Sequence, residues 1–323
     1  MSDLWAIALL AAAVGFALSI GAHYTGACMG MAYAARALRL RTALLIMAPL
    51  ALGGAILASG AVEATVGGQL LGAPVVQLPL GFSIIGSAFA LTAAYNFVRL
   101  PTSTIQILVF AVVGGGIAEG VPVEWSTIEH LVVVWAVVPP LAALLGFLAT
   151  RWTAPRSGST HPAWERGAAV GGVLVVAGAV ASFVMGANDV SNASGALVMT
   201  GLIGPLAAAA IGGAGLSVGV ITWGRPLLQR VAFETVSLDR RTASIAQFVQ
   251  SGLVLGAVAV GLFTSLNQAL IGAMAGTGLA RGRSTVNRSV VLGILAGWAV
   301  GPASGFALAL VVTSALRALG ALP

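Results

Sequence analysis

The chain has 323 residues, of which 59% are hydrophobic and only 7% are charged, and its mean hydropathy is +1.02. Soluble domains carry about 25% charged residues, so this chain cannot supply the charged surface that a soluble enzyme or a nucleic-acid-binding protein needs. The composition also argues against a disordered chain. It predicts an all-α integral membrane protein that contacts the lipid bilayer and binds no nucleic acid.

Ten apolar runs lie between the charged positions, and a transmembrane helix needs about 20 such residues. The two longest runs, and the two that begin at Pro101 and Phe263, fit either one crossing or a pair of re-entrant half-helices. The predicted segments are Leu4–Ala35, Thr42–Val62, Val75–Val98, Pro101–Ala118, Leu131–Thr150, Ala168–Thr200, Gly204–Trp223, Thr242–Leu262, Phe263–Ala280 and Val290–Leu316.

The first run contains the sequence SIGAHYTGACMG at residues 19–30, where a Gly-Ala pair and polar residues predict a break in the helix. His23 lies at this break and has two interpretations. It is either a proton acceptor or anion donor of a binding site, or a histidine that only hydrogen-bonds at the break.

The fourth run opens with PTSTIQ at residues 101–106. Pro101 suits the first turn of a helix because it lacks an N–H group. Hydroxyls and free backbone N–H groups at a helix N-terminus can hold an oxyanion without a buried arginine. Capping alone would also explain Ser103, but Gln106 in apolar surroundings favours a binding site.

A polar stretch at residues 151–167 predicts a linker that divides the chain into two membrane halves, residues 1–150 and 168–323. In the second half, the segment GANDVSNASG at 186–195 holds Asp189, the only carboxylate that we place inside the membrane. A central Asp costs about 2.5–3.5 kcal/mol on insertion scales, and such residues are usually functional. A polar cluster that only satisfies a helix kink is the simpler alternative.

The two halves are related in sequence. Residues 184–195 align with 19–30 at an offset of 165, and LFTSLNQALIGAMAGTGLARG at 262–282 aligns with residues 100–120 at an offset of 162. Two matches in the same order predict a tandem repeat of five segments each, and an odd number inverts the second copy in the membrane.

The arginines support this topology, because cytoplasmic loops carry most basic residues. With the N-terminus outside, 14 of the 15 arginines fall on the cytoplasmic side and only Arg317 falls outside. The outer face receives five acidic residues, namely Asp3, Glu63, Glu119, Glu124 and Glu129.

Several motifs resemble those of the inorganic phosphate transporter (PiT) family. GANDVSNASG resembles its GANDVANA-type signature, PTSTIQ resembles its Pro-x-Ser-Thr-Thr-His hairpin, and TSLNQ at 264–268 is a more distant match. The resemblance covers most of the chain. The first signature lacks Asn and Asp, the hairpin histidines are replaced by Gln106 and Gln268, and GAHYTGACMGMAYAARAL is similar to the branch that includes sulfate permeases.

The resemblance implies a secondary transporter that holds one oxyanion near the membrane centre and couples it to Na⁺ or H⁺. Asp189 is the candidate ligand for a metal ion such as Na⁺, and no further cofactor is expected. The expected coupling-cation residues are His23, Asn188 and Asp189. The expected substrate-binding residues are Ser103, Thr104, Gln106, Asn192, Ser265, Asn267 and Gln268.

We therefore expect a permease for inorganic phosphate in a bacterial cytoplasmic membrane, with sulfate as the alternative anion and a homodimer weakly indicated. Asp189 favours phosphate, whose proton can be donated to a carboxylate, whereas sulfate has none. An uncoupled anion channel is a further alternative. An enzyme is not expected, because the sequence shows no nucleophile or metal cluster to accompany Asp189.

Overall fold

The computed structural model describes residues 2–73, 75–99, 102–154, 168–230, 239–282 and 288–322, and the described part is helical throughout except for its connections. Pro101 and most of the predicted linker lie outside the described residues. The helices are α1 (Ser2–His23), α2 (Thr25–Ala34), α3 (Leu40–Ala58), α4 (Gly60–Gly68), α5 (Leu78–Phe97), α6 (Thr104–Glu119), α7 (Trp125–Trp152), α9 (Ala168–Met199), α10 (Pro205–Trp223), α11 (Arg225–Arg230), α12 (Arg240–Ala259), α13 (Leu266–Ala280) and α14 (Arg288–Ala318).

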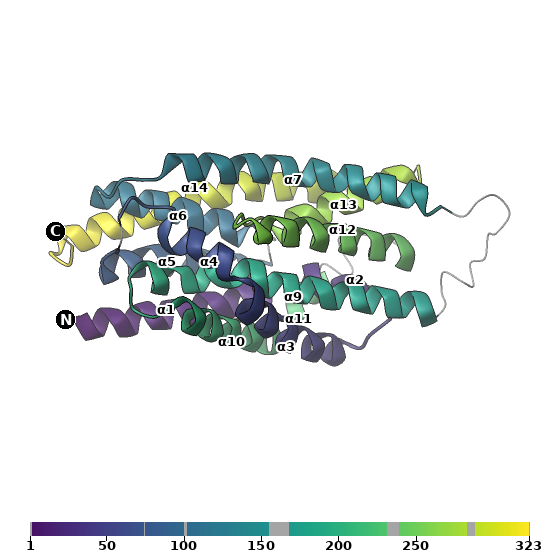
Figure 1. Ribbon diagram of the computed structural model, residues 1–323, viewed down its shortest axis with the longest axis horizontal. Helices are drawn as coiled ribbons and strands as arrows, with labels where there is room; N and C mark the ends of the chain where they lie inside the picture. Colours follow the sequence, from purple (N-terminus) through teal and green to yellow (C-terminus); the bar gives the residue numbers. More distant parts are fainter. Residues whose placement is uncertain are drawn as a thin grey trace.

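Eight stretches of the described chain are long and apolar enough to cross a membrane. They lie roughly along the long axis of the molecule, and both termini are at the same end (Figure 1). The structure thus has the architecture of an integral membrane protein, as the composition predicts. Where we predicted segments beginning at Pro101 and Phe263, the structure has the shorter helices α6 and α13.

The two short helices begin inside the bundle instead of at its end. Ser103 and Ser265 precede them with extended backbone. The helices have 16 and 15 residues, which gives lengths of about 24 and 22 Å, less than the roughly 30 Å of a hydrocarbon core. We call these two short helices, α6 and α13, half-helices because of their length.

The two signature segments differ in local structure. The first apolar run is interrupted at Tyr24, which separates α1 from α2 with φ −95° and ψ 4°. The prediction of a similar break in the second run is wrong, because α9 continues for 32 residues through Asp189. Asn188 and Ser194 of α9 contact Thr264 and Glu63 through their side chains, while the α9 backbone stays helical.

Small residues allow α9 to lie directly against α3. A Cβ atom at Gly186 would overlap the backbone carbonyl of Ala51, and a Cβ atom at Gly54 would overlap that of Phe183. Such close approach is typical of membrane helices, in which packing replaces the hydrophobic driving force. The close packing fixes the position of α9, the helix that carries the GANDVSNASG segment, within the bundle.

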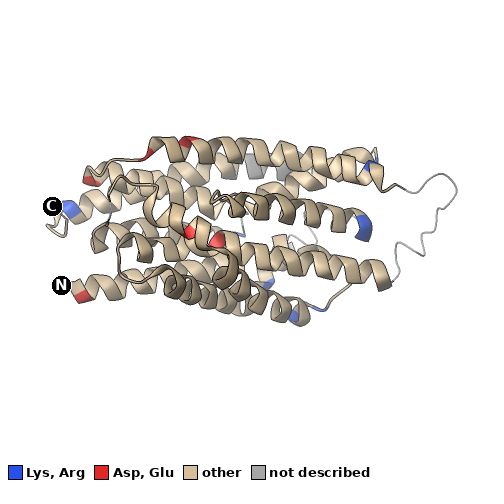
Figure 2. Cartoon of the chain, viewed as in Figure 1, with Lys and Arg blue, Asp and Glu red and all other residues tan. Residues whose placement is uncertain are grey.

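The two ends of the bundle differ in charge (Figure 2). Acidic segments mark the end that holds both termini, and arginines lie mainly at the opposite end, as the sequence pattern predicts. Arg317, in the last turn of α14, is the exception at the acidic end.

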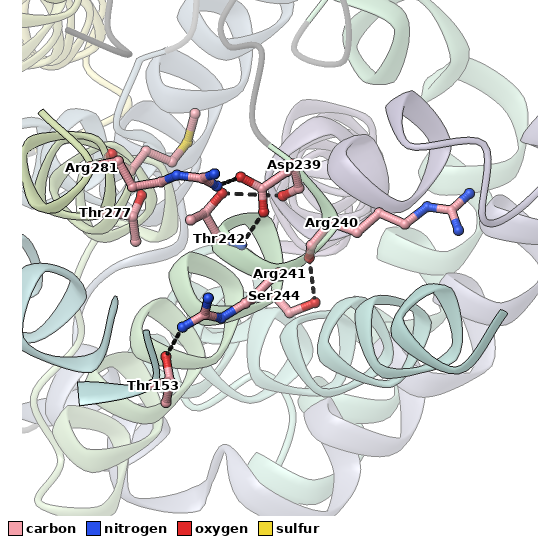
Figure 3. Close-up of polar contacts among 9 residues, drawn as sticks. Thr153, Asp239, Arg240, Arg241, Thr242, Ser244, Thr277 and Arg281 are labelled. Atoms are coloured by element: carbon pink, nitrogen blue, oxygen red, sulfur yellow. Dashed lines mark hydrogen bonds and ion pairs between the residues drawn. The ribbon is translucent and has the colours of Figure 1, made fainter. Parts of the chain in front are cut away.

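A polar cluster ties three helices together at the arginine-rich end (Figure 3). Asp239 caps α12 by accepting a hydrogen bond from the Thr242 N–H at 3.0 Å, and it forms an ion pair with Arg281 at the end of α13. Arg241 donates to the Thr153 hydroxyl after α7 at 2.9 Å. These contacts hold the ends of α7, α12 and α13 close to one another.

Asp189 is not the only buried carboxylate in the described part of the chain. Glu63, which we placed on the outer face, is 1% exposed and contacts the Ser194 hydroxyl of α9. The predicted segment Thr42–Val62 ends before Glu63 because that residue is charged. In the structure the chain continues after Ser59 as the short helix α4, which contains Glu63. Val62 and Val66 beside Glu63 are buried as well.

Candidate oxyanion and cation site

The N-termini of the half-helices α6 and α13 form the first part of the site. The N-cap hydroxyls of Ser103 and Ser265 accept hydrogen bonds from the backbone N–H groups of Gln106 and Gln268, each at 3.4 Å. Both serines are 1% exposed or less. Because the first turn of a helix carries unpaired N–H groups and a partial positive charge, two anion-attracting ends lie in the interior.

These two helix ends meet. The Gln268 side-chain amide donates to the Gln106 side-chain carbonyl at 3.3 Å, and the Asn267 amide donates to the Thr102 backbone carbonyl at 3.3 Å. The structure therefore brings together the predicted residues of two segments that lie about half a chain apart. All of these side chains are buried.

His23 and Asn188 hold the two half-helices in equivalent ways. The His23 Nε2 atom lies 3.0 Å from the Thr102 carbonyl oxygen and 3.3 Å from its N–H nitrogen. Asn188 donates to the Thr264 carbonyl at 2.8 Å and accepts from the Thr264 N–H at 3.2 Å. Each residue thus clamps the backbone just before an N-cap serine. The other ring nitrogen of His23 lies 2.6 Å from the side-chain oxygen of Asn96.

Asp189 is 0% exposed and lies beside these clamps. Asn192 donates to its Oδ1 atom at 3.4 Å, and Asn188 and the Tyr24 hydroxyl also lie around the carboxyl group. The Tyr24 hydroxyl is 3.1 Å from the Thr104 hydroxyl. Tyr24 therefore joins the carboxylate to the start of α6.

Several buried polar atoms at this place have no hydrogen-bond partner in the described part of the chain. Buried polar groups are normally paired, so a cluster of unpaired ones calls for water, an ion or a ligand. The atoms are Thr102 Oγ1, Asp189 Oδ2, Ser191 Oγ, Asn192 Oδ1, Thr264 Oγ1 and Gln268 Oε1.

The polar groups of this site supply two kinds of chemistry. N–H groups at two helix ends, hydroxyls and amides can hold an oxyanion through neutral donors. The oxygens of Asp189 and Asn192, which lie three residues apart on the same face of α9, can hold a small cation. One site can thus hold both ions in neighbouring positions.

Sequence reasoning missed Tyr24 and Thr264 as site residues. The repeat alignment places Tyr24 opposite Asp189, and Thr264 opposite Thr102, so the signal was present. It also missed Gln247 of α12, which is fully buried and donates to the Ala27 carbonyl at 2.7 Å. No local pattern distinguishes that glutamine from a surface one.

A family model described as the phosphate transporter family matches residues 20–156 and 159–309 of this chain. A sulfate permease from Bacillus subtilis, CysP, is 28% identical over 289 residues, which cover 89% of this chain and 81% of the permease. The chloroplastic inorganic phosphate transporter 2-1 of Arabidopsis thaliana is 24% identical over 408 residues, which cover 92% of this chain and 70% of that protein.

A solved structure has the same fold. It is the structure of a sodium-dependent phosphate transporter, with a TM-score of 0.87 and 22% identity, and the match covers 98% of this chain and 99% of the other. The family model, which spans both halves and includes every residue of the site, is decisive. This chain is a member of the phosphate transporter family.

Proposed function

We propose that the protein is a secondary transporter that carries an inorganic oxyanion together with a coupling cation. The observation that carries this proposal is the meeting of the α6 and α13 N-termini beside Asp189, among buried polar atoms that lack partners. Family membership supports transport, and not catalysis, as the activity.

The oxyanion would lie between the two half-helix ends. Ser103, Thr104 and Ser265 offer hydroxyls there, and backbone N–H groups of the first turns add fixed donors. No arginine is needed, because preorganised neutral dipoles in a dry site stabilise an anion strongly. Gln106, Gln268, Asn192 and Asn267 complete the proposed binding set.

The coupling cation would bind at Asp189. Its unpaired Oδ2 atom and the unpaired Asn192 oxygen supply negative charge and lone pairs, and Asn188 orients the neighbouring backbone. We assign His23 a positioning role at the equivalent place in the first half, since both its ring nitrogens already have neighbours. The cation and the anion would then attract each other across the site, which couples their binding.

We further propose that residues 1–150 and 168–323 are inverted repeats. Exchange of the two halves maps the contact of α1 with α10 onto that of α9 with α3, and the contact of α6 with α14 onto that of α13 with α7. The His23 and Asn188 clamps map in the same way. Such a repeat allows the site to open alternately to each side of the membrane, here the cytoplasmic membrane of a bacterium.

Phosphate is our first candidate for the anion. Monohydrogen phosphate can donate its O–H group to the unpaired Asp189 oxygen, whereas sulfate carries no proton at neutral pH. Sulfate is the second candidate, because the similarity to the Bacillus subtilis sulfate permease extends over most of both chains.

Uptake of radiolabelled phosphate and sulfate into proteoliposomes tests the proposal, with each unlabelled anion as a competitor. We expect saturable uptake of one anion that responds to an imposed cation gradient. Absence of saturable uptake of both anions would refute it, and uptake that ignores all imposed gradients would favour an uncoupled channel.

A further inference from the structure

Glu63 of α4 is a second buried carboxyl group that the proposed site does not use. It is 1% exposed, its Oε1 atom contacts the Ser194 hydroxyl of α9, and its Oε2 atom has no hydrogen-bond partner in the described part of the chain. Ser194 belongs to the signature segment and follows Asp189 by five residues, about 7.5 Å along the helix. The carboxyl group therefore touches the helix that carries the cation site.

The contacts of Ser194 are compatible with a protonated Glu63. The Ser194 oxygen contacts the Glu63 carboxyl and also donates to the Val190 carbonyl at 2.8 Å. A hydroxyl has only one hydrogen to donate. When that hydrogen lies on the Val190 carbonyl, the hydrogen between Ser194 and Glu63 must come from the carboxyl group. A neutral Glu63 would let both contacts be full hydrogen bonds at once, whereas a carboxylate would have to share the single Ser194 hydrogen with the Val190 carbonyl.

The charges around Glu63 agree with a neutral acid. The elements packed against α4 are α3, α9, α10 and α12. On α9 the titratable group is Asp189, which is also acidic, and α10 has none. The basic residues Arg41 of α3, and Arg240 and Arg241 of α12, lie at the far ends of their helices, about 25 Å from α4 along the helix axes. A buried carboxylate without a cationic partner is costly, so the group holds a proton instead.

The C-terminal end of α4 borders a hollow in the protein surface. A hollow of about 410 Å³ is lined by Gly68, Gln69, Gly72 and Glu124, among others. Gly68 is the last residue of α4 and follows Glu63 by five residues, about 7.5 Å. A path for protons to Glu63 would begin at this hollow.

We propose that Glu63 is a proton-carrying site that couples anion transport to a proton, in addition to the cation bound at Asp189. Open to the outside, the carboxylate takes a proton from hydronium and leaves water. Open to the inside, the O–H bond breaks and the proton passes to water, while the Ser194 hydrogen turns from Val190 to the carboxylate. This inference rests on the proposed anion transport.

The test compares wild-type protein with Glu63→Gln and with Glu129→Gln in proteoliposomes. Glutamine imitates the neutral acid and can still donate to Ser194, so Glu63→Gln should fold and should exchange external for internal labelled anion. With equal sodium on both sides and an acidic exterior, wild-type protein and Glu129→Gln should accumulate the anion several-fold. Glu63→Gln should only equilibrate it. Glu129 is an exposed carboxylate and serves as the matched control.

The outcomes separate the two proposals. If wild-type protein neither exchanges nor takes up either anion, anion transport itself is refuted. If it transports the anion but ignores the pH gradient, or if Glu63→Gln accumulates as well as wild type, the role of Glu63 is refuted. Infrared spectra of the wild-type protein give a check that needs no transport. We expect a carbonyl band of a buried carboxylic acid that is absent in Glu63→Gln, and identical bands in both proteins would overturn the assignment.

Discussion

The clamp between Asn188 and Thr264 offers a quantitative test of how α13 is positioned. Asn188→Ala removes two buried hydrogen bonds, of 2.8 and 3.2 Å, and leaves the Thr264 carbonyl and N–H without partners. Each buried group left unpaired costs about 1–3 kcal/mol, or about 2–6 kcal/mol in total. If the anion-bound state carries this cost, kcat/KM for uptake falls at least about 30-fold, since about 1.4 kcal/mol is tenfold.

Initial rates of labelled anion uptake in proteoliposomes measure this loss. Ser217→Ala is the control. It removes only the hydroxyl contacts of Ser217 with the Ala48 carbonyl of α3 at 2.7 Å and the Gly213 carbonyl of α10 at 2.9 Å. These contacts lie away from the site, so uptake should be unchanged. The loss in Asn188→Ala should persist at saturating coupling cation. Full recovery at high cation concentration, or wild-type kcat/KM throughout, would show that Asn188 does not position α13.

Four further substitutions test helix packing, the N-cap at the anion site and the ion pair at the arginine-rich end. Gly186→Leu should destabilise the protein by about 2 kcal/mol or more, the cost of overpacking a core, because its Cβ atom would meet the Ala51 backbone. Gly256→Ala is the control, since a Cβ atom there has open space, and it should be neutral or slightly stabilising. Thermal unfolding measures both effects. Ser265→Ala should cost about 1 kcal/mol as a lost N-cap and should raise KM for the anion; an unchanged KM would contradict the binding role. Arg281→Ala should cost at most about 1 kcal/mol, because the ion pair with Asp239 is partly exposed, and a larger loss on thermal unfolding would contradict this estimate.

The membrane class and the two half-helix N-termini could be predicted from sequence for simple physical reasons. Hydropathy reports the solvent around a helix directly, and arginines report the side of the membrane. Ser103 and Ser265 could be identified because an N-cap needs a hydroxyl at one defined position, and because the repeat places the same motif twice.

The contacts that complete the site could not be predicted in this way. Whether polar residues break a helix depends on partners in other helices, so α9 is continuous although its composition resembles that of the interrupted segment at Tyr24. The burial of Glu63 could not be predicted for the same reason, because it depends on the contact of α4 with Ser194 of α9. The contacts of Asn188 with Thr264 and of Ser194 with Glu63 join residues 76 and 131 positions apart, and no local pattern records them.

The position of the bound anion tests the central claim most directly. Crystals grown with selenate or arsenate, which imitate sulfate and phosphate and scatter anomalously, would locate it. We predict one strong anomalous peak between the N-termini of α6 and α13, within hydrogen-bonding distance of Ser103 and Ser265 and next to Asp189. A fully occupied peak elsewhere in the bundle, or no peak there at a concentration that saturates uptake, would contradict the account.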